Sequence, residues 1–179
     1  MGDSTLYDDD ILLWSEQQAA VIRRLRETAR RLPNELDIEN VAEAIESVGR
    51  SELATVQSFI ELILVHLIKL VIEPDAASVG HWRREVGGFH SNIKRRYSPS
   101  MRQRIDMDEI WDDARDQLQL GYGASEREVV VRLGDKCPVA LDDLLGKRID
   151  ADGLIEQVSL TRQPRDLTRF SESASETRD

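Results

Sequence analysis

Two carboxylates, Glu43 and Glu46, lie three residues apart, a spacing that places both on one face of a helix. Glu39 lies one turn earlier on the same face. Paired carboxylates can hold a divalent cation or divide acid and base roles, provided that a partner helix adds ligands. Like charges at this spacing are also common on solvated faces, and we favour ion pairing to Arg83, Arg84 or the first helix.

A second candidate pair, His66 and Lys69, lies inside the apolar run Leu64–Val71. A buried lysine without a partner loses its proton, and such a lysine can act as a general base or a Schiff-base nucleophile. The alternative is that Lys69 extends its amine to the surface while His66 hydrogen-bonds a neighbouring helix. We favour this structural alternative.

Trp82 and Arg83 are the third candidate pair. They could line a ligand groove in which the guanidinium of Arg83 binds a carboxylate or a phosphate. The simpler interpretation is that Trp82 is a core aromatic, as we expect for Trp14 and Trp111, whose indole N–H groups then need partners.

Signatures of better-known sites are missing from the sequence. His81 and His90 are nine residues apart, on opposite faces of a helix, and His66 belongs to another helix. The sequence has no glycine-rich phosphate loop and no G-x-S-x-G turn. Cys137, the single cysteine, excludes an intrachain disulfide and is more typical of a small structural residue than of a reactive thiol. We therefore predict no metal and no cofactor.

The stretch from Leu36 to Pro74 must position most of these residues. Asp37 occupies a typical helix N-cap, and Pro74 ends the run because proline cannot continue a helix. Apolar residues recur between them at helical spacing, at Ile38, Val41, Ile45 and Val48, and at Val56, Ile60, Ile63, Leu67 and Val71.

Gly49 and Ser51 leave two arrangements open for this stretch. Gly49 could end one helix and Ser51 cap the next, which would form a tight hairpin. Alternatively, one long helix tolerates Gly49, and we favour this arrangement. Glu43 and His66 would then lie roughly 35 Å apart and could not share a site.

The remaining pattern predicts helices over 8–32, 79–97 and 98–120, with Asp106 as a possible interruption of the last, and short helical segments over 129–133 and 138–145. From about Leu160 the chain is polar and lacks periodicity. The predicted fold class is all-α, an antiparallel bundle of about four main helices plus short C-terminal helices. We expect a single helical domain over 1–150 and a disordered tail over 151–179.

The composition of the 179-residue chain, 40% hydrophobic and 32% charged, is that of an ordinary globular domain. A net charge of −10 argues against general nucleic-acid binding. Residues 34–62 carry a net charge of −6 and residues 81–104 a net charge of +6. These segments could neutralise each other across a helix pair, or the basic one could face an acidic partner. The longest apolar run, 59–72, is too short and too charged to cross a bilayer, and we expect a cytoplasmic protein.

Several short patterns together resemble a bacterial family known as domain of unknown function 29. They are Tyr7, Asp10 and Trp14 in the arrangement Y-x-x-D-[FI]-x-x-W; Leu36-Asp37 with Asn40, Glu43, Ile45-Glu46, Gly49 and Ser51-Glu52; His66-Leu67-Ile68-Lys69 with Pro74 and Trp82-Arg83; Ser98-Pro99-Ser100-Met101-Arg102; and Cys137-Pro138. The resemblance covers roughly residues 6–146 and implies an all-α bundle in a bacterial cytoplasm, without an assigned activity. Leu70 and Val139 depart from it, because the family usually has tryptophan and another aromatic residue there.

The sequence thus favours a non-enzymatic binding or interaction module that associates with itself or with a protein partner, without binding nucleic acid or membrane. Its candidate binding residues are Glu43, Glu46, His66, Lys69, Trp82 and Arg83. Two alternatives stay open. One is a small metal-dependent hydrolase-like enzyme built on the first four of these residues. The other is an acidic, antitoxin-like partner of a basic protein.

Overall fold

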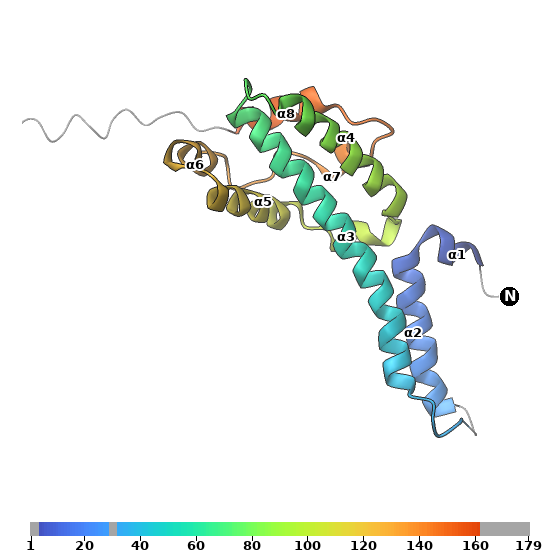
Figure 1. Cartoon of the computed structure of the whole chain (residues 1–179). Coiled ribbons are helices and arrows are strands. Elements are labelled where there is room, and N and C mark those ends of the chain that lie inside the picture. The colour runs from blue at the N-terminus through green and yellow to red at the C-terminus, as the bar shows by residue number, and fades with distance from the viewer. Residues whose placement is uncertain (1–3, 29–31, 162–179) are drawn as a thin grey trace, which may run out of the picture.

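The computed structural model describes residues 4–28 and 32–161, and within these ranges it is helical and contains no strand (Figure 1). The predicted all-α fold class is therefore confirmed. The elements are α1 (Ser4–Asp9), α2 (Ile11–Thr28), α3 (Ile38–Ile72), α4 (Val79–Arg96), the 3-10 helix η1 (Pro99–Arg104), α5 (Met107–Gly121), α6 (Ala124–Val131), α7 (Leu141–Leu145) and α8 (Ala151–Leu160).

Helix α3 is the axis of the molecule. It runs without a break from Ile38 to Ile72, as predicted, and Gly49 lies within it. The side chain of Asp37 caps its first turn by accepting the backbone N–H of Asn40 at 3.2 Å. With 35 residues the helix is about 50 Å long.

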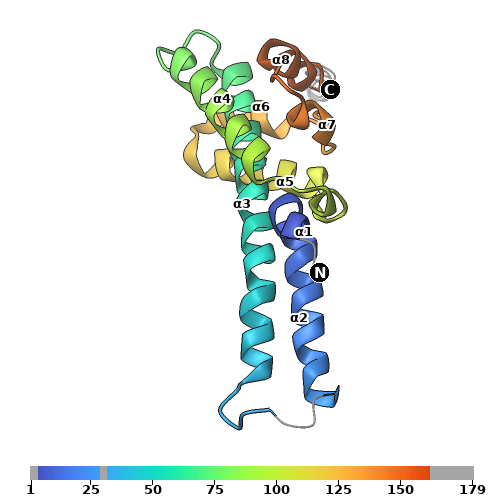
Figure 2. The same ribbon diagram turned by 90° about the vertical axis from the view of Figure 1, so that its right-hand side faces the viewer.

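The two halves of α3 have different surroundings (Figures 1 and 2). Helix α2 lies antiparallel to its N-terminal half, and the two form a helical hairpin that projects from the rest of the molecule. Helices α4 to α8 surround the C-terminal half. We call the hairpin of residues 11–28 and 38–53 the arm, and the remainder of the described chain the body.

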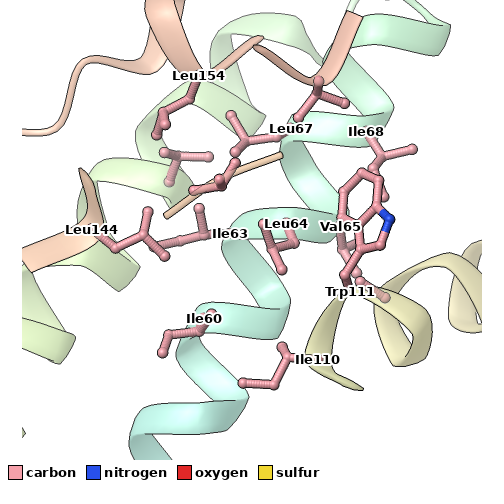
Figure 3. Packing of buried hydrophobic residues seen from close by; sticks show 14 of the residues in the cluster. Ile60, Ile63, Leu64, Val65, Leu67, Ile68, Ile110, Trp111, Leu144 and Leu154 are labelled. Atoms are coloured by element: carbon pink, nitrogen blue, oxygen red, sulfur yellow. The ribbon is translucent and has the colours of Figure 1, made fainter. Parts of the chain in front are cut away.

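The hydrophobic core lies in the body, around α3. Residues Ile63 to Ile68 are buried in an unbroken run, which means that this part of the helix is covered on all sides. Figure 3 shows α3 side chains packed against Trp111 of α5, Leu144 of α7 and Leu154 of α8. By length and composition α3 could also cross a membrane, but half of its most apolar window is buried inside the molecule, as in the core helix of a globular protein.

Two predicted helices are divided in the structure. The first predicted helix, 8–32, is divided into α1 and α2 at Asp10. The carboxylate of Asp10 accepts the backbone N–H of Leu13 and so caps the N-terminus of α2. The fourth is divided into η1 and α5, because the Asp106 carboxylate caps α5 by accepting the N–H groups of Asp108 and Glu109. The possible interruption at Asp106 is thus present.

Residues 151–161 differ from the predicted disordered tail. They form α8, capped by Asp150, which accepts the N–H of Gly153 at 3.1 Å. Leu154 and Val158, one turn apart, are buried where α8 packs on α3. Two apolar residues stabilise a helix as short as α8 only when they pack on another element, and the sequence alone does not identify that element. The rest of the predicted tail, 162–179, lies outside the described residues.

Small residues line the seam of the arm. The side chains buried between α2 and α3 include Ser15, Ala19 and Ala42, together with Gly49. A Cβ atom on Gly49 would lie 2.2 Å from the Ser15 hydroxyl oxygen and 2.9 Å from the Leu12 Cα atom. Because one of these contacts is backbone, the two helices cannot keep their present separation with any larger residue at position 49.

The arm is joined to the body by a buried carboxylate. Asp10 is 6% exposed and accepts hydrogen bonds from the Ser100 backbone N–H at 2.9 Å and the Ser100 hydroxyl at 2.6 Å. Burial by itself would raise the pKa of the Asp10 carboxyl, but the hydrogen bonds from Ser100 and Leu13 outweigh burial and lower the pKa below 3.8. The ionised carboxylate therefore holds the start of α2 against η1.

We expect Gly49→Ala to lower the free energy of unfolding by about 1–3 kcal/mol, because the added methyl group forces α2 away from α3. Gly88→Ala is the matched control, since Gly88 is an exposed residue of α4 and a Cβ there meets no atom within 4 Å. Gly88→Ala should raise the free energy of unfolding by about 0.5–1 kcal/mol, because alanine reduces the backbone entropy of the unfolded chain. Urea denaturation measures both, and equal effects would contradict the tight seam.

We expect Asp10→Asn to cost about 1–3 kcal/mol at pH 6, the range for charged hydrogen bonds. Because the folded-state pKa is lowered, this stabilisation is full above the unfolded carboxyl pKa of about 3.9 and is lost as pH falls through the lower folded value. The difference between wild type and variant should therefore shrink towards pH 2.5 in denaturation curves. Asp8→Asn, at an exposed carboxylate of α1, is the control and should show no such pH-dependent loss.

Candidate functional site

The acidic residues Glu43 and Glu46 lie on the arm, where arginines neutralise them. Arg23 of α2 contacts Glu46 at 2.7 Å and Glu43 at 3.7 Å, and it also contacts Glu39 at 3.6 Å. Arg50 of α3 pairs with Glu43 and lies 3.8 Å from Glu46. The hydrogen bond from Arg23 holds the pKa of the Glu46 carboxyl below its usual range. The expected ion pairing to the first helix is present, whereas Arg83 and Arg84 take no part in it.

His66 is buried in the body with both ring nitrogens hydrogen-bonded. Nδ1 lies 2.6 Å from the carbonyl oxygen of Leu62, and Nε2 lies 2.7 Å from Oε2 of Glu85 on α4. His81, exposed on α4, lies 3.2 Å from the same Glu85 oxygen. The arrangement ties α3 to α4, which is the structural role favoured from the sequence.

Lys69 and Trp82 meet at a cavity of about 410 Å³ between the ends of α3, α4 and α5. The Lys69 amine lies 5.8 Å from the centre of the Trp82 ring, close enough for a cation–π interaction. The wall also contains Glu73 and Tyr122. Burial raises the pKa of the Tyr122 hydroxyl, and the neighbouring carboxylate of Glu73 raises it further. Lys69 is half-buried at the wall of this cavity.

Arg83 does not share this cavity with Trp82. Its guanidinium pairs at 2.8 Å with Asp152 of α8, and both side chains are exposed. Successive residues of a helix point about 100° apart, so the two neighbours serve different contacts. Arg83 links α4 to α8, and Trp82 closes the cavity.

The six candidate residues therefore belong to separate places. Glu43 and Glu46 are 20 or more positions before His66 on one unbroken helix, which corresponds to roughly 30–35 Å. In the described part of the chain, no three His, Cys, Asp or Glu side chains are grouped to hold a metal ion. Cys137 is not activated, because burial raises the pKa of its thiol to about 11. A reaction centre that needs Glu43, Glu46, His66 and Lys69 together is incompatible with this geometry.

Four large apolar side chains of the arm are exposed. Val21 and Leu25 of α2 are 42% and 39% exposed, and Val41 and Val48 of α3 are 38% and 45% exposed. Val41 and Val48 each lie one residue before a buried seam position, and Val21 lies one residue before the half-buried Ile22, so these three side chains point about 100° away from the seam. Leu25 lies one turn after Val21 on the same side of α2. In the sequence, the seam is indicated by the small residues next to these apolar ones, because small residues allow two helices to approach closely.

The arm consequently has two unlike faces. In an antiparallel pair, residues that precede the seam positions fall on one side of both helices, and residues that follow them fall on the other side. The ion pairs of Arg23 with Glu39 and Glu43 confirm this geometry, because all three residues follow seam or adjoining half-buried positions. On the opposite side are the exposed apolar residues, and we call that surface the arm face. Its members are Gln18, Val21 and Leu25 of α2, and Val41, Ile45 and Val48 of α3.

Charge appears at the edge and at the base of the arm face. Ala44 of α3 and Arg24 of α2 are exposed along its edges. At the base, Val48 lines a cavity of about 480 Å³ with Tyr7 and with charged residues of both signs, Asp8, Asp9, Glu52, Arg95 and Arg96. The uncharged part of the surface is therefore the centre of the arm face.

These features define an all-α protein in which a two-helix arm projects from a helical body. The family model described as Domain of unknown function DUF29 matches residues 6–150, and the chain belongs to this family. An alpha-helical protein of unknown function from Rhodospirillum rubrum, solved as a crystal structure, is 30% identical. The alignment covers 85% of this chain and 96% of that one, with a TM-score of 0.74. No curated protein matches the chain.

We expect Glu85→Leu to cost about 1–3 kcal/mol of stability, because it leaves the buried Nε2 of His66 without an acceptor. His81→Ala removes the exposed partner of the same carboxylate and should cost less than about 0.5 kcal/mol. Thermal denaturation of the two variants beside wild type measures the difference. Equal losses would mean that the exposed contact matters as much as the buried one.

Proposed function

We propose that this protein is a non-enzymatic interaction module that binds another protein through the arm face. The observation that carries the proposal is the exposure of Val21, Leu25, Val41 and Val48 on one side of a hairpin that the body leaves uncovered. Helices are stable when their apolar stripe is buried against another element, and the arm has a second stripe without such an element.

The expected partner surface is helical. A pair of antiparallel helices is half of a four-helix bundle, and a bundle buries the face that the pair alone exposes. The small side chain of Ala44, at the α3 edge of the arm face, would let a further helix approach to ordinary packing distance, about 8–10 Å between axes. The opposite face of the arm carries the Arg23 and Arg50 ion pairs and is suited to solvent.

This proposal includes a cytoplasmic location and neither nucleic-acid nor membrane binding, in keeping with the overall charge of −10. The hydrolase-like alternative is weakened because its four residues are distributed along α3. The antitoxin-like alternative is weakened because Glu39, Glu43 and Glu46 of the acidic segment already have arginine partners within the chain.

Site-specific photocrosslinking in cells that express the chain tests the proposal. A photoreactive phenylalanine analogue at position 41 of the arm face should form crosslinked adducts with protein. The same analogue at position 43 is the matched control, since Glu43 lies two residues away on the exposed opposite face. We expect at least a fivefold difference in adduct yield, measured on immunoblots and identified by mass spectrometry.

Adducts from position 41 and few from position 43 would support binding through the arm face. Equal yields from both positions, or adducts from position 43 alone, would contradict it. Adducts to a basic protein from position 43 would instead favour the antitoxin-like alternative.

A further inference from the structure

We infer that the partner of the arm face is a second copy of this chain, so that two arms pack together as a four-helix bundle. This inference rests on the proposed function and names its partner. In the dimer, the arm face of one protomer would cover the arm face of the other around a twofold axis, and the two bodies would lie outside the bundle.

Charge is the first reason for choosing an identical partner. A twofold contact places the same surface against itself, so any charge near the axis meets its own kind. The residues along the centre of the arm face are uncharged: Gln18, Val21, Leu25, Val41, Ile45 and Val48. An uncharged surface gives no electrostatic preference for a different protein, and two copies of it can approach each other without charge repulsion.

The position of the charged residues supports the same choice. Glu39, Glu43 and Glu46 lie on the far side of the arm, where they form ion pairs with Arg23 and Arg50. Self-association through the arm face would leave these ion pairs in solvent and require no desolvation of them. An approach through the other face would bury at least five charged groups, which is costly.

The size of the arm face sets the expected strength of the dimer. Helix α2 has 18 residues and is about 27 Å long, and two adjacent helices are about 20 Å wide. The footprint is therefore about 540 Å² on each copy, or about 1,100 Å² in total, at the lower end of specific interfaces. We expect a reversible dimer with a dissociation constant in the micromolar range, although area alone does not determine affinity.

Sedimentation velocity of the purified full-length chain from 1 to 200 μM tests the inference. We expect the mass to rise from 20.4 kDa towards twice that value with increasing concentration. Val41→Glu should raise the dissociation constant at least tenfold, because it places a charge within the apolar arm face of each copy, where association would desolvate it. Val131→Glu is the matched control, since Val131 is 60% exposed on α6 of the body, and it should leave the dissociation constant unchanged.

Circular dichroism at 222 nm checks that Val41→Glu keeps its helix content, and Val41→Thr serves in its place if it does not. Hydrogen exchange of wild type at 1 and 200 μM adds a readout without mutation. Protection that grows with concentration should map to residues 11–28 and 38–53. Protection that grows in the body would overturn the inference.

The outcomes separate the inference from the proposed function. A purified chain that stays monomeric to 200 μM, with position 41 still crosslinked selectively to a different protein, rejects the second copy and keeps the interaction module. A monomer without selective crosslinks rejects both. If Val131→Glu abolishes the dimer and Val41→Glu does not, the arm face is rejected as the dimer interface.

Discussion

The continuity of α3 is the constraint on which the other elements depend. A single helix of 35 residues serves two environments, and each remaining element is placed by the half of α3 that it contacts. In the body, six consecutive residues, Ile63 to Ile68, are buried, so helices must surround this half. In the arm, buried positions of α3 recur at most once a turn, and one partner helix, α2, is sufficient to cover them.

Polar groups in the interior act as joints between these parts. Asp10 fastens the base of the arm to η1, His66 and Glu85 fasten α3 to α4, and the Trp111 indole donates to the Gly134 carbonyl at 2.8 Å. Asp10, His66 and Gly49 are also among the residues that carry the family resemblance. Their contacts are structural, which explains how a chain can match a family through polar and glycine residues without forming a reaction centre from them.

The candidate residues do not converge on one centre, and the reason is physical. Carboxylates, a histidine and a lysine on apolar helices have the composition of a catalytic site, but catalysis needs them within a few ångströms of one another. Distance along an unbroken helix prevents this for the acidic pair and His66. Lys69 and Trp82 do meet beside a cavity, although they belong to different helices and their residue types and spacing do not predict this contact.

The sequence by itself determined the helical class, the continuity of α3 and the helix boundary at Asp106, because these features depend on local interactions. Apolar spacing and caps such as Asp37 and Asp106 act within one or two turns of their own helix. Tertiary structure alone decided that α8 is a packed helix rather than a tail, and which of two adjacent stripes forms the seam of the arm. Both choices depend on contacts between distant segments. At Gly49 the absence of a Cβ atom lets Leu12 and Ser15 approach, so the small residues are buried and the valines beside them face outward.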